Sequence, residues 1–275
     1  MTTSFPLARS DETLLTTIAT FRYMTAEQLM RLLYSPSSLS YVQKHLTRLV
    51  DSGFLLRSRL PKALDAGSTP FVYSLALPGI RIVRQLGMVV TERVRASEEA
   101  TRAGRNLTHT LAITDVLITF LAAERRGTLR VLHYLPEWQM KKQREPRARI
   151  NDAFADVVYQ KIGYPLLIEV ELWSKDEGRF KAKIRDLVQG LSGPLFAALA
   201  IDAATVLWLC YEGPHPETHR TRYQRWAEEE LMRIGAKDLA QNFLFTSCPA
   251  LDSQAFLFGQ VWYEPFTETP LSLWG

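Results

Sequence analysis

The stretch RINDAFADVVY, residues 149–159, followed by LLIEVEL, residues 166–172, decides the fold of the larger part of this chain. Within them, residues 153–159 and 166–172 are predicted strands. In the second, the two-residue alternation of a strand places the aliphatic side chains on one face and Glu169 and Glu171 on the other. Two carboxylates on an otherwise apolar strand are costly to bury unless a cation or a basic group accompanies them. The pattern therefore indicates a polar site built into a sheet.

Asp152 stands where the first of these strands begins. We expect a tight turn through Gly163 and Pro165 to pair the two strands antiparallel, which would bring Asp152 close to Glu169. An Asp and a Glu that converge on one point form a hard-oxygen site suited to Mg²⁺. Such a metal polarises a scissile phosphate and activates water. Asp152 and Glu169 are therefore the predicted metal ligands, and Mg²⁺ or Mn²⁺ is the expected cofactor if the site is active.

A site that cleaves phosphodiesters in this way usually adds a lysine. Lys175 follows the strand by a few residues, and Lys181 and Lys183 lie on a helix predicted over residues 178–191. Lys183, one turn from the start of that helix, can point back at the sheet and is the first candidate, with Lys181 as the fallback. The predicted catalytic set is Asp152, Glu169, Glu171 and Lys183. The alternative is that the two glutamates only form salt bridges with nearby basic residues.

The N-terminal part has a different pattern. Helical spacing of apolar residues over 11–21, a capping box at Thr25 and a helix over 40–52 are followed by two short strands, 54–59 and 71–75. Three short helices and a two-stranded ribbon predict a winged helix-turn-helix, whose third helix would enter the major groove of DNA. The predicted contacts to DNA are Ser40, Gln43, Lys44, Thr47 and Arg48 on that helix, and Arg57, Arg59 and Lys62 on the ribbon.

The distribution of charge supports a DNA partner. The whole chain has a formal net charge of only +4, but residues 1–85 contain ten Lys and Arg against five Asp and Glu. A second basic run, residues 141–149, stands just before Asp152, and its Lys141, Lys142 and Arg144 are predicted phosphate contacts. The alternatives are a winged helix used for protein contact and a basic run that is a solvated loop.

Asp152, a strand ending in Glu-x-Glu and a lysine on the next helix resemble the PD-(D/E)xK, restriction-endonuclease-like superfamily. Asn151-Asp152 corresponds to the "PD" and Glu169-Val170 to the "(D/E)x". The chain departs from the pattern at the next position, where Glu171 stands in place of lysine. The resemblance implies that the lysine has moved to the helix, to Lys183. The departure favours the alternative of a domain that has lost catalysis and binds DNA or partners.

The chain also resembles the replication-relaxation family of plasmids and integrative elements, and is similar to MobC-type mobilisation proteins. The short matching segments are Val72–Leu75 with Pro78-Gly79, Leu107–Val116, Asn151-Asp152, Leu167–Glu171 and Lys183-Ile184. The resemblance implies a DNA-binding protein that acts in replication, DNA relaxation or mobilisation by metal-dependent nicking of double-stranded DNA. The alternative is a non-catalytic regulator or adaptor whose second domain serves as a homodimer interface or docks mobile-element proteins.

These observations predict an α/β protein with an α+β N-terminal domain. The winged helix occupies residues 1–87, a linker residues 88–105, and a restriction-endonuclease-like α/β domain with a mixed central sheet residues 106–275. The longest apolar stretch, residues 195–210, is interrupted by Asp202 and is shorter than a membrane span. We see no secretory signal pattern and expect a cytoplasmic protein without a membrane partner.

Overall fold

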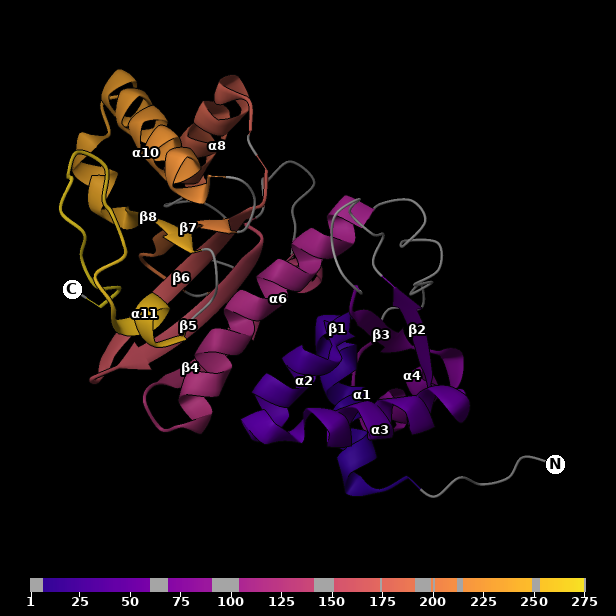
Figure 1. The fold of residues 1–275 in the computed structure, drawn as a ribbon. Coiled ribbons are helices and arrows are strands. Elements are labelled where there is room, and N and C mark those ends of the chain that lie inside the picture. Colours follow the sequence, from indigo (N-terminus) through magenta and orange to yellow (C-terminus); the bar gives the residue numbers. More distant parts are fainter. Residues whose placement is uncertain are drawn as a thin grey trace. The chain divides into compact units, whose positions relative to one another are not determined.

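The computed structural model describes residues 7–59, 69–90, 104–140, 151–173, 175–190, 199, 201–211, 215–248 and 253–274 (Figure 1). The chain forms two compact units, which divide after Thr114. The division falls within α6 (Gly104–Arg125), so the long helix contributes its first half to one unit and its second half to the other. Each unit is described by itself below.

The N-terminal unit contains helices and a small antiparallel sheet in the order predicted from the sequence. Its elements are α1 (Arg9–Phe21), β1 (Met24–Thr25), α2 (Ala26–Leu33), η1 (Pro36–Ser38), α3 (Leu39–Asp51), β2 (Leu55–Arg59), β3 (Phe71–Leu75) and α4 (Leu77–Gln85). The strands are ordered β1-β3-β2. The apolar stripes form the core: Leu14, Leu15 and Ile18 of α1 and Leu46 and Leu49 of α3 are fully buried.

Local signals set the helix ends in this unit. The Thr25 hydroxyl accepts a hydrogen bond from the Gln28 backbone N–H, and the Gln28 side chain accepts one from the Thr25 N–H, which confirms the predicted capping box. Gln28 also donates to the Leu111 carbonyl at 2.9 Å and so anchors the first half of α6. Gly53 follows α3 with φ 75°, a left-handed conformation that costs glycine little.

The C-terminal unit is built on a five-stranded sheet in the order β4-β5-β6-β7-β8. Its elements after α6 are β4 (Arg130–Leu135), α7 (Glu137–Met140), β5 (Ala153–Tyr159), β6 (Ile162–Glu171), α8 (Glu177–Gly190), β7 (Thr205–Tyr211), α10 (Pro216–Arg233), η2 (Lys237–Asn242), β8 (Phe243–Cys248) and α11 (Ser253–Phe258). The β4-β5 and β5-β6 pairs are antiparallel, whereas β6-β7 and β7-β8 are parallel. The predicted mixed central sheet is confirmed.

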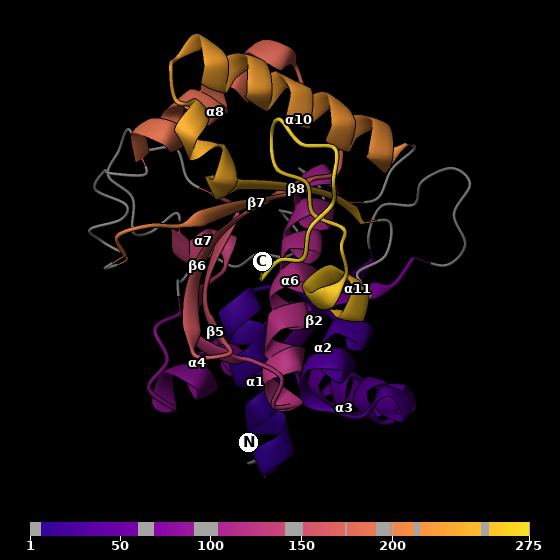
Figure 2. The ribbon, with the colours of Figure 1, turned by 90° about the vertical axis from the view of Figure 1, so that its left-hand side faces the viewer.

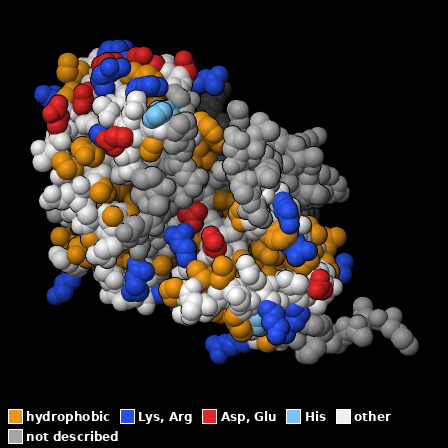
Figure 3. All heavy atoms as spheres, viewed as in Figure 1, with side chains coloured by type: hydrophobic (Ala, Val, Ile, Leu, Met, Phe, Trp, Pro, Cys, Tyr) orange, Lys and Arg blue, Asp and Glu red, His pale blue; other side chains and the backbone are white. Residues whose placement is uncertain are grey.

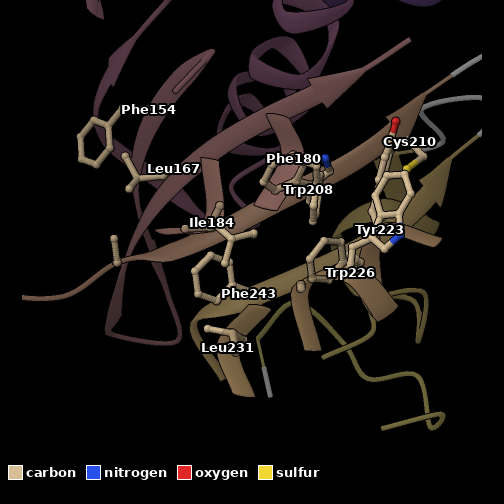
Figure 4. Close-up of a cluster of buried hydrophobic side chains, with 14 of the residues drawn as sticks. Phe154, Leu167, Phe180, Ile184, Trp208, Cys210, Tyr223, Trp226, Leu231 and Phe243 are labelled. Atoms are coloured by element: carbon tan, nitrogen blue, oxygen red, sulfur yellow. The ribbon is translucent and has the colours of Figure 1, made fainter. Parts of the chain in front are cut away.

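Helices cover both faces of this sheet. On one face α8 and α10 pack together over β6, β7 and β8 (Figures 1 and 2), and the core between them includes Phe180, Trp208, Tyr223 and Trp226 (Figure 4). On the other face lie the second half of α6 and α11, where the Phe120 and Phe256 rings meet at 5.8 Å. Both faces of β6 are therefore buried, and a polar side chain on it needs a partner within the protein.

The hairpin between β5 and β6 differs from the expectation. The turn lies at Gln160 and Lys161, which have φ values of 48° and 71°, and not at Gly163 and Pro165. Gly163 and Pro165 are inside β6, opposite Val158 and Asp156. Two consecutive residues with positive φ match the right-handed twist of a two-residue hairpin, but glycine or asparagine usually marks such a turn. The turn contains neither glycine nor asparagine, so the sequence carries no signal at its true position.

One helix in the described part of the chain, Leu107–Arg125, is long and apolar enough to cross a membrane by length and composition. In the folded chain, 67% of it is buried. A buried apolar helix is what a protein core requires, so this helix is no evidence for a membrane span.

Candidate active site

The antiparallel pairing of β5 and β6 brings Asp152 beside the acidic end of β6. The Asp152 backbone N–H donates to the Ile168 carbonyl at 2.9 Å, and the Val170 N–H donates to Asp152 Oδ2 at 2.9 Å. Asp152 is thus tied to β6 on either side of Glu169, through its backbone N–H at Ile168 and through its half-buried carboxylate at Val170. The predicted proximity of Asp152 and Glu169 follows from strand register, because Ala153 is paired with Ile168.

Glu169 is fully buried and is contacted on both oxygens. Asn151 Nδ2 donates to Glu169 Oε1 at 2.7 Å, and the Lys183 ammonium forms an ion pair with Oε2. Burial raises the pKa of Glu169 to about 8, because the loss of solvation and the nearby Asp152 charge outweigh the attraction of Lys183.

The second glutamate of β6 has its own lysine. Lys175 forms an ion pair with Glu171, which is also buried, and burial raises the pKa of Glu171 despite that lysine. The Lys175 and Lys183 ammonium groups lie 5.6 and 5.5 Å from the centre of the Trp208 ring on β7. Trp208 is directly opposite Glu169 in the strand register, so the aromatic ring supports both cations.

The two lysines predicted on α8 have different surroundings. Burial alone would lower the pKa of Lys183, but the charges of Glu169 and Asp152 raise it above its ordinary value, so Lys183 is a cation. Lys181 instead pairs with Glu177 and Glu229, each at 2.6 Å. Positively and negatively charged side chains are mixed on the surface over α8 and α10 (Figure 3). Lys183 therefore joins the acidic site and Lys181 does not.

The donor set is compatible with a divalent cation. The carboxyl groups of Asp152, Glu169 and Glu171 gather at the end of β6, and carboxylate oxygens are the ligands that Mg²⁺ prefers. Asn151 adds a carbonyl-type oxygen, Oδ1, that is buried and has no hydrogen-bond partner among the described residues. Among the described residues, no group of three or more His, Cys, Asp or Glu side chains is placed to hold a metal ion by itself. A metal here would need oxygens from outside this set, such as those of a phosphate or water.

The predicted DNA contacts in the N-terminal unit divide into two groups. Ser40, Gln43, Lys44 and Thr47 are exposed on one face of α3. Arg48, on the same helix, instead holds the buried Asp11 of α1 through contacts of 2.5 and 2.6 Å to its two oxygens. His45 Nδ1 also lies 3.2 Å from Asp11 Oδ1.

The remaining predicted contacts lie on the ribbon or outside the described residues. The Arg57 and Arg59 guanidinium groups each lie 4.6 Å from the centre of the Phe71 ring, which keeps both exposed cations on one face of the ribbon. Lys62, Lys141, Lys142 and Arg144 lie outside the described residues. The roles of Asp11, Phe71 and Trp208 have no signal in the sequence, since no local pattern marks a residue as the partner of a distant cation.

Comparison with known proteins adds one strong match. The sequence model of the family described as Replication-relaxation matches residues 15–191, more than half of the chain. A search of curated proteins finds no match.

Among solved structures, the chain is similar to one described as the restriction endonuclease FokI bound to DNA, with 12% identity and a TM-score of 0.25, and to one of FokI by itself, with 11% identity and a TM-score of 0.26. Each comparison covers 86% of this chain and 47% of the FokI chain, so this chain spans about half the length of those proteins. TM-scores this low carry no argument about the site.

Proposed function

This chain belongs to the replication-relaxation family, and from that premise we propose that it binds and nicks the DNA of a plasmid or other mobile element. Family membership supports a role in replication or DNA relaxation. Nicking is the step by which a protein relaxes supercoiled DNA without ATP. In this proposal the N-terminal unit binds duplex DNA and the C-terminal unit, a restriction-endonuclease-like domain, cleaves one strand.

The N-terminal unit has the order of elements of a winged helix-turn-helix, in which α3 is the recognition helix and β2 and β3 form the wing. The exposed Gln43 and Lys44 would contact base edges or phosphates from α3. Arg57 and Arg59 would contact the phosphate backbone from the wing. Arg48 would act indirectly, because its pairing with Asp11 fixes α3 against α1.

One observation carries the catalytic part of the proposal: Asp152 and the paired Glu169 and Lys183 occupy one site on β6, although they come from three separate elements. Asp152 and Glu169 would hold Mg²⁺ or Mn²⁺, which when bound polarises the scissile phosphate and activates water. Lys183 would stabilise the negative charge that develops on the phosphate. Asn151 would orient the Glu169 carboxylate through its 2.7 Å hydrogen bond.

Supercoiled plasmid incubated with the protein and Mn²⁺ tests this function. We expect conversion to the open circular form, its loss with EDTA, and its loss in Asp152→Ala and in the isosteric Glu169→Gln. Asp156→Ala is the matched control, since Asp156 lies on β5, just after Asp152 in the chain, and is paired in the strand register with Pro165, away from Glu169. Nicking that persists unchanged in both site variants would refute the catalytic proposal.

A second function is favoured by one specific feature. Glu171 stands where the restriction-endonuclease pattern has lysine, and Glu169 and Glu171 are each already paired with a lysine. A site whose charges are satisfied internally suits a non-catalytic DNA-binding regulator, in which the C-terminal unit forms a homodimer or docks a partner protein. Specific duplex binding unaffected by EDTA, together with a dimer in analytical ultracentrifugation and no nicking, would support this second function.

A further inference from the structure

Two residues just beyond the acidic end of β6 are open to solvent, unlike the site itself. Trp173 is 45% exposed and follows Glu171 by two residues. The Lys175 side chain is 34% exposed, against 14% for Lys183. All six tryptophans of the chain lie in the described residues, and Trp173 is the exposed one among them. An exposed aromatic residue and a partly exposed lysine therefore lie two positions apart in the chain, directly after the strand that holds the buried carboxylates.

The backbone on both sides of this pair is held by one buried side chain. The Tyr223 hydroxyl of α10 donates to the Trp173 carbonyl at 3.2 Å and accepts from the Lys175 backbone N–H at 2.8 Å. Tyr223 is fully buried, and its ring is stacked on Phe180 with centroids 4.9 Å apart (Figure 4). The core therefore fixes the backbone of Trp173 and Lys175 before any ligand arrives, which lowers the backbone entropy lost on binding.

The two side chains offer the two contacts that a single nucleotide needs. The face of an exposed tryptophan stacks on a base of any sequence, and an accessible lysine contacts the adjoining phosphate. Lys175 is paired with Glu171 in the free protein, and its partial exposure allows it to reach a phosphate from that position. Lys175 is the better placed of the two lysines for this adjoining phosphate, because Lys183 is more enclosed and is proposed to act at the scissile phosphate.

We propose that Trp173 and Lys175 bind an unpaired nucleotide beside the carboxylate site, so that the site acts on single-stranded or locally opened DNA. A base within an intact duplex has both faces covered by its neighbours, and Trp173 can stack only on a base that has left the helix. The proposal rests on the proposed function in one respect, namely that a phosphodiester is what the carboxylate site receives.

Fluorescence anisotropy in EDTA tests the proposal without chemistry. The probes are a labelled oligothymidine, a closed hairpin duplex and the same duplex with a central bubble of unpaired bases. We expect Trp173→Ala to weaken binding of the oligothymidine and the bubble about tenfold, as the loss of one stacked base does, and to leave the closed duplex unchanged. Trp173→Phe, which keeps an aromatic face, is expected to retain most of the affinity.

A matched control uses an aromatic–lysine pair elsewhere on the surface. Phe266 is 37% exposed and lies 5.1 Å from the Lys237 ammonium, so Phe266→Ala removes a similar pair far along the chain and should change none of the three affinities. Lys175→Ala should reduce the slope of log affinity against log salt for the oligothymidine by about one, and Lys175→Arg should restore it. Circular dichroism confirms that each variant is folded.

The proposal is overturned if Trp173→Ala binds the bubble with the affinity of the wild type. It is also overturned if the affinities for the bubble and for the closed duplex fall equally. Because the binding assay contains no metal, its outcome is separate from nicking. A plasmid that is never nicked, combined with the expected Trp173→Ala defect, would refute the proposed catalysis and leave this nucleotide site standing. Nicking that needs Asp152, combined with unaltered binding in Trp173→Ala, would support the proposed catalysis and refute this nucleotide site.

Discussion

The Lys183 ammonium of α8 is paired with the Glu169 carboxylate of β6, and the glutamate has no exposed surface. The pair joins a helix to the central sheet across 14 residues of sequence. A buried ion pair is stable only while both charges are present, since either one by itself is a charge removed from water without compensation.

We therefore expect Lys183→Met to lower the free energy of unfolding by about 3 kcal/mol, and the double variant Glu169→Gln/Lys183→Met to recover most of that loss. Urea denaturation at about pH 9, above the raised pKa of Glu169, measures both when it is followed by circular dichroism. The matched control is Lys181→Met, whose exposed ion pairs should contribute less than about 1 kcal/mol. Equal losses in Lys183→Met and Lys181→Met would contradict the buried pair.

The raised pKa of Glu169 predicts how stability depends on pH. Burial raises this pKa from its ordinary 4.5 to about 8, so between those values the folded protein holds a proton that the unfolded chain has released. Stability from this group is fully present below about pH 4.5 and is lost as the pH rises toward about 8. The unfolding free energy of the wild type minus that of Glu169→Gln should therefore fall between about pH 5 and about pH 8. A difference that stays constant or rises over this range would contradict the assignment.

The two lysines of α8 predict different effects on nicking. Lys183→Ala should reduce the rate on supercoiled plasmid by roughly 10²–10³, the usual effect of removing a group that stabilises transition-state charge. Lys181→Ala should leave the rate unchanged, because that ammonium pairs with Glu177 and Glu229 instead. Rates are compared at saturating Mn²⁺ on variants shown to be folded. A rate that falls only in Lys181→Ala would reverse the assignment.

If α3 contacts DNA as proposed, the stability of the N-terminal unit and its affinity for DNA depend on different residues of that helix. Hydrogen bonds from the Ala8 N–H, His45 and Arg48 hold the pKa of Asp11 below its ordinary value, although burial opposes them. Arg48→Ala should lower the unfolding free energy by about 2 kcal/mol, the contribution of hydrogen bonds to a buried charge. Lys44→Ala should leave stability unchanged and weaken duplex binding with a reduced salt slope. Unaltered stability in Arg48→Ala would show that the Asp11 contact does not hold the helix.

Much of the site could be predicted from neighbouring residues. The strand at 153–159, the antiparallel pairing of β5 with β6 and the proximity of Asp152 to Glu169 all follow from alternation and register, and these are confirmed. The predicted position of the turn was wrong. Gln160 and Lys161 adopt positive φ values, although glycine and asparagine are the residues that usually do so in such a turn. There the hydrogen bonding of the two long strands overrides the local preference.

The sequence by itself determined the periodic elements, the acidic strand and the family, since each depends on residues a few positions apart or on motifs read along the chain. The tertiary structure alone decided which charges meet: Lys183 with Glu169, Lys181 with Glu229 across 48 residues, and Arg48 with Asp11 across 37. Helix periodicity does not distinguish between two lysines two positions apart. The packing of α8 against β6 does, because it encloses one ammonium beside a carboxylate and leaves the other on the outer surface.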